Sequence, residues 1–534
     1  MRTDQRPTRS GLPLEVRTLP SVVRAGARSY PDREAVVDGP IRLTFAELAD
    51  EVTTFARALI GRGVEPGDRV AIWAPNSWHW VVAAMGIVSA GAVMVPLNTR
   101  FKGAEAGYIL RKTAARLLVT DDGFLGNPYV AMLADEVLPD LVGIVVLGAV
   151  PSAGRDVASW ESFVARAASV PAEIATARAD AVSPDDLCDI FFTSGTTGLP
   201  KGAMLTHGQS IALYVAWSEL ADLRAGDRYL LVNPFFHTFG YKAGVIACLL
   251  RGATIVPQPV FTVEQTLDLV AREKITVLPG PPTLYTSILE HPARRGHDLS
   301  SLRVAVTGAT TVPVVLIERM RTELALETVI TAYGLTETCG TATMCRPDDD
   351  PVTIATTCGR AVPDVEVRVV GPDGQPLPCG KPGEVNIRGY NIMRGYFEDV
   401  AATKDTVDAE GWLRTGDIGV LDERGYLRIT DRLKDMFIVG GFNAYPAEIE
   451  QTLVRHAAVS EAAVIGVPDD RLGEVGRAYV VLRSGATATE AELVDFCRSR
   501  LANYKVPRSV VLVGSLPRNA SGKVVKAVLR EREE

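Results

Sequence analysis

The stretch Thr193-Ser-Gly-Thr-Thr-Gly-Leu-Pro-Lys-Gly202 decides how the rest of the chain is interpreted. It follows the apolar run Ile190-Phe191-Phe192, which is typical of a buried strand. Its glycines allow tight turns and let backbone N–H groups approach an anion, while the hydroxyl groups and Lys201 add donors and positive charge. It is not a Walker A loop, because no Gly-Lys-Ser/Thr ends it and no helix is expected to start at the lysine. A polyphosphate cradle and a flexible surface loop both remain open on this stretch alone.

Length and composition limit the class of protein. The chain has 534 residues, enough for two or more domains, and its 47% hydrophobic and 22% charged residues are typical of globular proteins. A net charge of −8 argues against a general nucleic-acid binder, although a local basic pocket for phosphates stays compatible with it. The seven dispersed cysteines form no C-x-x-C pair, which disfavours a disulfide framework or zinc site and favours the cytoplasm.

The first half of the chain alternates strand-like and helical patterns. Residues 69–73 and 93–95 are expected to be strands, joined by a helix that Asn76 or Ser77 caps and that ends near Gly91. This helix is predicted to be buried rather than to cross a membrane, and residues 1–20 lack the apolar core of a signal peptide. Further strands are expected at residues 229–232, 254–256 and 303–306, and helices at 104–113 and from Thr206 or His207 to Leu220. The alternation predicts an α/β fold with largely parallel sheets.

The pattern changes after Asp348. Short strands interrupted by Pro and Gly are expected at residues 365–370, 383–388 and 426–429, which indicates a small β-rich subdomain. A boundary near residues 431–435 leaves about 100 residues for a small mobile α+β domain. There Pro446 is expected in the first turn of a helix, and Thr487 with Glu490 is expected to form a capping box. The helix that this box opens is predicted to carry Leu493, Cys497 and Leu501 on one face.

Two motifs suggest a nucleotide site. In residues 331–338, Tyr333 beside Gly334 can stack on a flat base, and Thr336 beside Glu337 suits a phosphate and Mg²⁺. The alternative for this motif is a strand end followed by a helix cap. In residues 411–417, Asp417 lies on a glycine-framed turn and can accept both ribose hydroxyls, although a simple Asx turn is the competing interpretation.

Two further motifs lie towards the C-terminus. Residues 431–435 lead to Gly440-Gly441-Phe442, and their alternative interpretation is a charged surface linker. Residues 517–523 end in Lys523 on a glycine-flanked loop that could reach a distant active site; the alternative is a basic tail.

In this order and over nearly the full length, the five motifs resemble the adenylate-forming superfamily of acyl-CoA synthetases, luciferases and adenylation domains of peptide synthetases. The resemblance implies an N-terminal AMP-binding domain at residues 1–431, a hinge at 432–435 and a mobile C-terminal domain at 436–534. It implies a reaction in which a carboxylic acid and ATP give acyl-AMP and pyrophosphate, after which CoA gives acyl-CoA and AMP. ATP, Mg²⁺, CoA and a small carboxylic acid are then the expected ligands, without nucleic acid or a membrane span; a homodimer is left open.

The resemblance also assigns roles to residues. Those implied to hold the departing phosphates are Thr193, Ser194, Gly195, Thr196, Thr197, Gly198 and Lys201. Those implied to contact the rest of the nucleotide are Gly308, Ala309, Tyr333, Gly334, Thr336, Asp417 and Arg432. Catalytic roles are implied for Lys523, which bridges the carboxylate and α-phosphate, for Thr336, for the Mg²⁺ ligand Glu337 and for His237. Lys434 matches the hinge; Gly440, Gly441 and Phe442 match the CoA tunnel; and His237, Phe239, Tyr241 and Gly334 match the acyl pocket.

The acyl-pocket segment bears on the choice of acid. Residues 233–240 carry no carboxylate, whereas amino-acid-activating relatives usually place an aspartate there, so an acid without an α-amino group is expected. Residues 233–244, 278–285, 306–313 and 343–347 resemble actinobacterial CoA ligases of steroid-ring breakdown, which activate a propanoate on a methylated hexahydroindane-dione. One departure is Thr310-Thr311 after the Gly-Ala pair, where the family often has proline.

Three alternatives stay open beside this assignment. They are a CoA ligase for medium-chain fatty or aryl acids, an adenylating enzyme that loads a carrier protein, and a non-catalytic nucleotide-binding protein. The joint presence of Lys201, Glu337, Asp417, Arg432 and Lys523 argues against the last.

Overall fold

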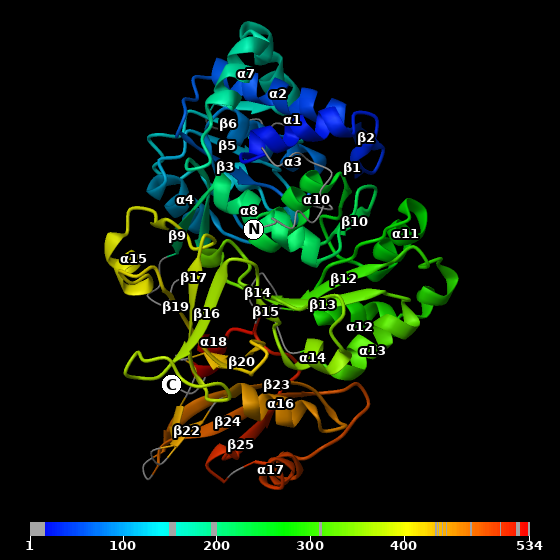
Figure 1. Ribbon diagram of the computed structural model, residues 1–534, viewed down its shortest axis with the longest axis vertical. Coiled ribbons are helices and arrows are strands. Elements are labelled where there is room, and N and C mark those ends of the chain that lie inside the picture. The colour runs from blue at the N-terminus through cyan, green and yellow to red at the C-terminus, as the bar shows by residue number, and fades with distance from the viewer. Residues whose placement is uncertain are drawn as a thin grey trace, which may run out of the picture.

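Figure 1 shows the computed structural model, which describes residues 16–148, 156–193, 200–308, 312–432, 435, 437–439, 442–444, 446–469, 472–501, 503–518 and 524–531. At residues 431, 432, 438, 442 and 443 it describes the backbone alone. The fold is α/β, with a large N-terminal part and a smaller C-terminal part that lies at the bottom of Figure 1.

An eight-stranded sheet forms the centre of the first half of the chain. Its order is β18 (Gly395–Tyr396), β9 (Lys201–Thr206), β8 (Leu187–Thr193), β4 (Val93–Pro96), β3 (Arg69–Trp73), β5 (Leu117–Thr120), β6 (Gly143–Val146) and β7 (Val157–Ser159). The strands from β8 to β7 are parallel, whereas β9 is antiparallel to β8 and β18 is antiparallel to β9. The sheet therefore confirms the largely parallel arrangement expected from the alternating pattern.

Helices of this region begin where the capping residues predict. Ser77 accepts a hydrogen bond from the Trp80 N–H and caps α3 (Trp78–Ser89). Thr206 and Gln209 form a capping box at the start of α8 (His207–Leu220). The other helices before β10 are α1 (Leu19–Ser29), α2 (Phe45–Gly61), α4 (Gly103–Lys112), α5 (Tyr129–Met132), α6 (Trp160–Val164) and α7 (Ala172–Ala181).

Two four-stranded sheets contain the strands from the middle of the chain. One sheet has the order β10 (Arg228–Leu231), β11 (Thr254–Pro257), β1 (Glu34–Asp38) and β2 (Ile41–Thr44). Another has the order β12 (Val304–Gly308), β13 (Thr328–Tyr333), β14 (Thr343–Met344) and β15 (Arg360–Ala361). Val277 links these two sheets, because it forms parallel β-bridges with Tyr229 of β10 and with Val304 of β12. The helices here are α9 (Thr238–Gly240), α10 (Ala247–Arg251), α11 (Val263–Glu273), α12 (Pro282–Glu290), α13 (Val314–Glu323) and α14 (Pro351–Thr356).

The expected β-rich subdomain is an antiparallel sheet. It consists of β16 (Val365–Val370), β17 (Gly383–Gly389), β19 (Leu413–Leu421) and β20 (Leu427–Arg432), with α15 (Val400–Thr406) between β18 and β19. In Figure 1 it lies between the larger sheets and the C-terminal part.

The C-terminal part has its own sheet and its own core. The sheet contains β22 (Phe442–Ala444), β21 (Phe437–Val439), β24 (Gly473–Leu482), β23 (Val459–Asp469) and β25 (Ser509–Leu512). Helices α16 (Pro446–Val454), α17 (Glu490–Arg498) and α18 (Lys526–Glu531) accompany it. Ile449, Val464 and Leu493 are fully buried in a hydrophobic cluster separate from that of the N-terminal part. A separate core is what an independently packed unit requires.

The expected N-cap of α17 was wrong by two residues. The capping box of α17 is Thr489 with Glu492, not Thr487 with Glu490, although both pairs have the same spacing. The later pair forms because residues 483–486 are still part of the turn that follows β24, where Gly485 has a positive φ. Leu493 and Cys497 are buried as expected, whereas Leu501 lies beyond the end of the helix.

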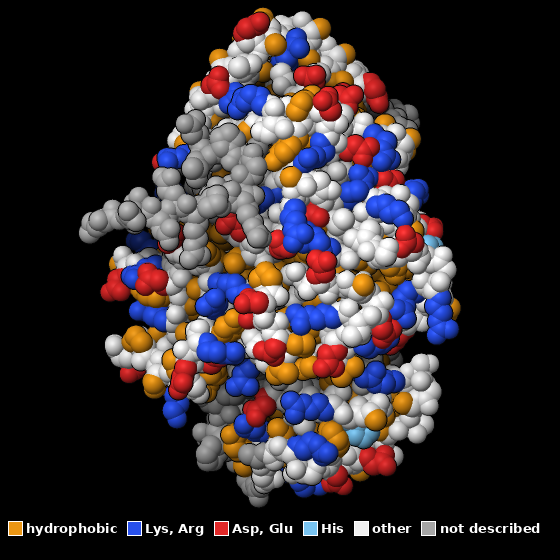
Figure 2. Space-filling model, turned by 45° about the vertical axis from the view of Figure 1, so that its right-hand side comes forward, with side chains coloured by type: hydrophobic (Ala, Val, Ile, Leu, Met, Phe, Trp, Pro, Cys, Tyr) orange, Lys and Arg blue, Asp and Glu red, His pale blue; other side chains and the backbone are white. Residues whose placement is uncertain are grey.

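The surface mixes charges of both signs. Acidic and basic side chains are interspersed on the face shown in Figure 2. Across the ranges that the structure describes, every helix is too short or too polar to cross a lipid bilayer.

Candidate active site

The Gly/Thr-rich loop connects two antiparallel strands. Thr193 ends β8 and Lys201 begins β9, and the two residues are opposite each other in the strand pairing. The lysine therefore begins a strand and not a helix, which confirms that the loop is not of the Walker A type. The loop residues Ser194, Gly195, Thr196, Thr197 and Gly198 lie outside the described residues.

Glu337 lies beside the start of this loop. Its Oε1 accepts hydrogen bonds from the Thr193 hydroxyl at 3.3 Å and from the Tyr396 phenol at 2.8 Å. The Lys201 ammonium lies 5.3 Å from the centre of the Tyr396 ring, a cation–π distance. Burial and the neighbouring Glu337 raise the pKa of Tyr396 well above its usual value, so the phenol remains a donor at neutral pH. Within the described residues Oε2 of Glu337 has no hydrogen-bond partner, which leaves one carboxylate oxygen for a ligand.

Tyr333 and Asp417 form the second contact between predicted site residues. The Tyr333 phenol donates a 2.6 Å hydrogen bond to Oδ2 of Asp417, which is buried on β19. Burial, and then the Asp417 carboxylate, raise the pKa of Tyr333 well above its usual value. The backbone of Arg432 pairs with Asp417 across β19 and β20.

Small residues bring backbone segments together near Tyr333. Gly308, at the end of β12, is paired with Ala332 of β13. At Gly334 a Cβ would lie 2.5 Å from the Cα of Thr341, so only glycine fits without backbone movement. Thr336 begins a short 3-10 helix, Thr336–Thr338, that presents Glu337. Ala309 lies outside the described residues.

The acyl-pocket segment follows β10. His237 is exposed and its Nδ1 accepts a hydrogen bond from the Phe239 N–H at 3.2 Å. Desolvation of the imidazole by the surrounding protein lowers the pKa of His237, and this favours the neutral ring. Phe239 is half-buried. Tyr241 is fully buried, and its ring contacts Trp80 at a centroid distance of 5.3 Å.

Asn76 holds the start of this segment, and it was not identified as a site residue from the sequence. Its Nδ2 donates to the carbonyls of Leu231 and Asn233 at 2.9 and 3.0 Å, and its Oδ1 accepts from the Phe235 N–H at 2.8 Å. The sequence offered Asn76 only as a helix cap, because its partners lie more than 150 positions away. Tyr396 was missed for the same reason, since only the folded chain brings it to Glu337.

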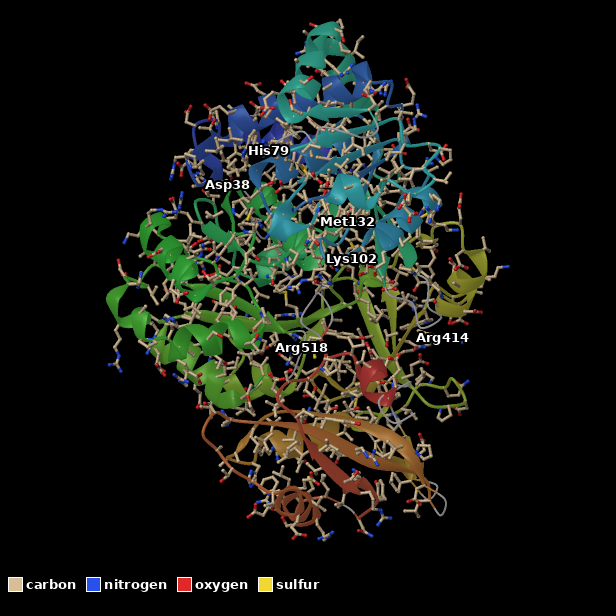
Figure 3. All side chains as sticks on the ribbon, turned by 180° about the vertical axis from the view of Figure 1, so that it is seen from behind. Asp38, His79, Lys102, Met132, Arg414 and Arg518 are labelled. Carbon is tan, nitrogen blue, oxygen red and sulfur yellow. The ribbon has the colours of Figure 1, made fainter. Side chains whose placement is uncertain are left out.

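The C-terminal candidates fall mostly outside the described residues. Lys434, Gly440, Gly441 and Lys523 are among those not described, and Phe442 begins β22. The backbones of Arg518 and Val524 form an antiparallel β-bridge. Figure 3 shows Arg518 between the C-terminal sheet and the N-terminal part. Asp435, in the expected hinge, accepts a 2.9 Å hydrogen bond from Arg530 of α18.

No group of three or more His, Cys, Asp or Glu side chains in the described ranges is arranged to hold a metal ion. A cation at Glu337 would therefore take most of its ligands from water or from a bound phosphate.

Known proteins match the chain along its length. A family model described as AMP-binding enzyme matches residues 23–397, and one described as AMP-binding enzyme C-terminal domain matches residues 448–523. The 3-[(3aS,4S,7aS)-7a-methyl-1,5-dioxo-octahydro-1H-inden-4-yl]propanoyl:CoA ligase of Rhodococcus jostii (strain RHA1) is 54% identical, covering 97% of this chain and 99% of that protein. The protein of the same name from Mycobacterium tuberculosis (strain ATCC 25618 / H37Rv) is 53% identical, with the same two coverages. Among solved structures, the anthranilate CoA ligase AuaEII in complex with anthranoyl-AMP is 29% identical, with a TM-score of 0.85 over 98% of both chains.

Proposed function

The chain belongs to the AMP-binding enzyme family, and we propose that this AMP-forming acyl-CoA ligase activates the propanoate side chain of a methylated hydroindane-dione, a steroid-derived acid. One observation carries the choice of acid: identity of 54% and 53%, along 97% of the chain, to two ligases named for that propanoyl group. The reaction itself is supported by the separate contacts of Glu337 and Asp417.

The first half-reaction forms the acyl-adenylate. A carboxylate oxygen of the acid attacks the α-phosphorus of ATP, and the bond from that phosphorus to the bridging oxygen of pyrophosphate breaks. In our proposal Thr193, Lys201 and the loop residues 194–198 hold the β- and γ-phosphates as charge develops on them. The antiparallel pairing of Thr193 with Lys201 supports this role, because it sets the two ends of the loop beside each other.

Glu337 fits a magnesium ion that is brought in with ATP. Mg²⁺ is usually bound through one or two carboxylates together with substrate phosphates. The carboxylate oxygen Oε1 is oriented by Thr193 and Tyr396, while Oε2 is without a partner in the described residues. When bound, the ion would neutralise phosphate charge; Thr336 would contact the α-phosphate from the adjacent position.

The nucleoside is assigned to the Tyr333–Asp417 pair. Tyr333 would stack on the adenine, with Gly308, Ala309 and Gly334 leaving room for the base. Asp417 would accept the ribose hydroxyls, with Arg432 nearby. The hydrogen bond from Tyr333 orients the Asp417 carboxylate, so base and ribose would be positioned by one coupled unit.

The second half-reaction needs a different arrangement of the C-terminal domain. We assign the domains to residues 1–431 and 436–534 and the hinge to 432–435, with Lys434 at its centre. Lys523 would bridge the acid and the α-phosphate first and then withdraw, after which Gly440, Gly441 and Phe442 would line the pantetheine tunnel. The CoA sulfur then attacks the acyl carbon, and AMP leaves with the electrons of the broken C–O bond.

The acid would lie against the segment that contains His237 and Phe239. A neutral imidazole and aromatic rings suit an apolar ring system, with Gly334 contributing to the wall. Tyr241 is fully buried in the structure, so it would support this wall from behind rather than line it. His237 would sit between the acyl pocket and the pantetheine tunnel.

A panel of acids tests the proposal. The protein is incubated with ATP, Mg²⁺, CoA and one acid at a time: the hydroindane-dione propanoate, hexanoate or coumarate. We expect AMP and thioester in equal amounts, with the highest kcat/KM for the hydroindane-dione acid. Higher kcat/KM on hexanoate or coumarate would reject the proposed acid, and AMP release without free thioester would indicate that a carrier protein replaces CoA.

A further inference from the structure

A fully buried ion pair joins β8 to the π-helix Tyr241–Ile246. The Nζ of Lys242 is 2.8 Å from Oδ2 of Asp189, and neither side chain is exposed to solvent. Burial disfavours the charged ammonium, but the adjacent Asp189 carboxylate raises the pKa of Lys242 well above its usual value. Such a pair is weak evidence for stability, because the desolvation of two charges offsets much of their attraction.

The pair belongs to a network of buried polar groups. Lys242 also donates to the Ser210 hydroxyl at 2.7 Å, and Ser210 donates to the carbonyl of Thr206 at 2.9 Å. The Cys188 thiol donates to Oδ2 of Asp189 at 3.1 Å. In the part of the chain that the structure describes, Oδ1 of Asp189 has no hydrogen-bond partner, so the carboxylate relies on Lys242 and Cys188.

Three segments of the candidate site converge on this network. Asp189 is in β8, the strand that ends at Thr193 and enters the phosphate loop. Lys242 is in the π-helix Tyr241–Ile246, directly after the acyl-pocket segment. The Ser210 hydroxyl lies 3.9 Å from the sulfur of Cys339, which follows the Glu337 motif, and Tyr214 donates to the Cys339 carbonyl at 2.9 Å.

Lys242 lies in a π-helix, Tyr241–Ile246. π-Helices are rare and occur frequently at functional sites. Here the element packs closely on β10, since a Cβ at Gly244 would lie 2.4 Å from a methyl group of Leu231. The close packing holds the element that carries Lys242 against β10.

We propose that Lys242 and Asp189 are positioning residues for adenylation, which hold the strand entering the phosphate loop in register with the acyl-pocket segment and the Glu337 motif. This inference rests on the proposed function. Neither side chain contacts a substrate; the pair acts through Thr193 and Glu337. In-line attack requires the acid and the α-phosphate to be aligned, and a displacement of about 1 Å can cost about 10²-fold in rate.

The test separates positioning from folding. The double variant Lys242→Met/Asp189→Asn removes both charges at nearly constant volume, so it avoids an uncompensated buried charge. The single variant Lys242→Met leaves Asp189 buried without its cation and is expected to lower Tm more than the double variant does. The first half-reaction is measured as pyrophosphate exchange, and the second as thioester formation from supplied acyl-AMP, which no longer needs the phosphate loop.

We expect the double variant to have a Tm close to wild type and a kcat for pyrophosphate exchange lowered about 10- to 100-fold. Thioester formation from acyl-AMP should fall less than about 3-fold, because it does not use the pyrophosphate contacts. The control is Arg303→Met/Asp227→Asn, which removes a largely buried ion pair of 2.6 Å outside the candidate site, together with the 2.9 Å contact of Arg303 with Asp222. It should leave the ratio of the two rates unchanged.

Two outcomes would overturn the inference. Equal loss in both half-reactions would make the pair a general structural element, and full activity of a folded double variant would remove any role in positioning. Wild-type protein that forms no thioester from any acid would instead reject the proposed function, and this inference with it.

Discussion

The phenol of Tyr333 donates a hydrogen bond of 2.6 Å to Asp417, although the two residues lie 84 positions apart in the chain. Tyr333 ends β13, where the Tyr-Gly-Leu-Thr-Glu motif begins, and Asp417 is on β19 in the antiparallel sheet of the β-rich subdomain. The bond therefore joins two parts of the molecule at the point where we assign the adenine and the ribose. We therefore expect the proposed nucleotide site to depend on this single hydroxyl group.

Replacement of Tyr333 by Phe should weaken ATP binding without changing the chemistry. Loss of this hydrogen bond is expected to cost about 0.5–1.5 kcal/mol, or about 2- to 10-fold in the KM for ATP, with kcat little changed. Initial rates at varied ATP concentration measure the change. Tyr426→Phe removes a similar Tyr–Asp hydrogen bond, to Asp349, outside the candidate site and should leave the KM for ATP unchanged. Equal effects of the two variants would argue against a nucleotide role for Tyr333.

Glu337→Gln should raise the Mg²⁺ concentration needed for half-maximal adenylation and lower kcat about 10²-fold, because a neutral amide is a poor ligand for a hard cation. A magnesium titration of pyrophosphate exchange measures both effects. Tyr396→Phe, which removes only the hydrogen bond that orients the Glu337 carboxylate, should lower kcat about 10-fold. The surface variant Glu366→Gln is the control, since its carboxylate pairs only with arginine in the described structure. An unchanged magnesium requirement in Glu337→Gln would remove Glu337 from the metal site.

Lys523→Ala should abolish most adenylation and spare the second step. Loss of one preorganised positive group is expected to lower pyrophosphate exchange about 10²- to 10³-fold, whereas thioester formation from supplied acyl-AMP stays near wild type. Lys526→Ala, in the same terminal segment, removes a lysine that pairs with Glu450 and should leave the ratio of the half-reactions unchanged. A Lys523→Ala variant that lost both half-reactions equally would contradict the assigned role.

His207 should make the folded protein less stable at acidic pH. Burial lowers its pKa to about 3, and its Nδ1 accepts a hydrogen bond from the Leu19 N–H at 3.2 Å. Below the ordinary histidine pKa of about 6.5 the unfolded chain binds a proton that the folded chain does not, so stability falls as pH drops from about 6.5 towards 3. At about pH 5 the loss amounts to about 2 kcal/mol. His207→Asn keeps an acceptor but does not titrate, so the fall in Tm between about pH 7.5 and about pH 5 should be smaller in this variant. An identical fall in both proteins would show that His207 does not control it.

Much of the fold could be predicted because local signals set it. Residues 69–73 form the expected strand, Ser77 caps the expected helix and Thr206 starts the next one. Where two local signals compete, as in the Thr-x-x-Glu pairs before α17, spacing alone cannot choose between them. The preceding turn decides which threonine becomes the cap.

The parts of the site that depend on tertiary contacts could not be predicted. Lys242 and Asp189 lie 53 positions apart, and neither belongs to a motif that indicates an ion pair. Tyr396 meets Glu337 because β18 pairs with β9, which places it beside Lys201 at the start of β9. The motifs predicted the candidate residues of the site, whereas the side chains that orient them became visible only in the folded chain.

The most direct measurement follows the products of one turnover when the protein is given ATP, Mg²⁺, CoA and the hydroindane-dione propanoate. The account predicts one AMP, one pyrophosphate and one thioester for each acid consumed, and pyrophosphate exchange that needs the acid but no CoA. Release of ADP and phosphate, or no pyrophosphate with any carboxylic acid, would contradict it.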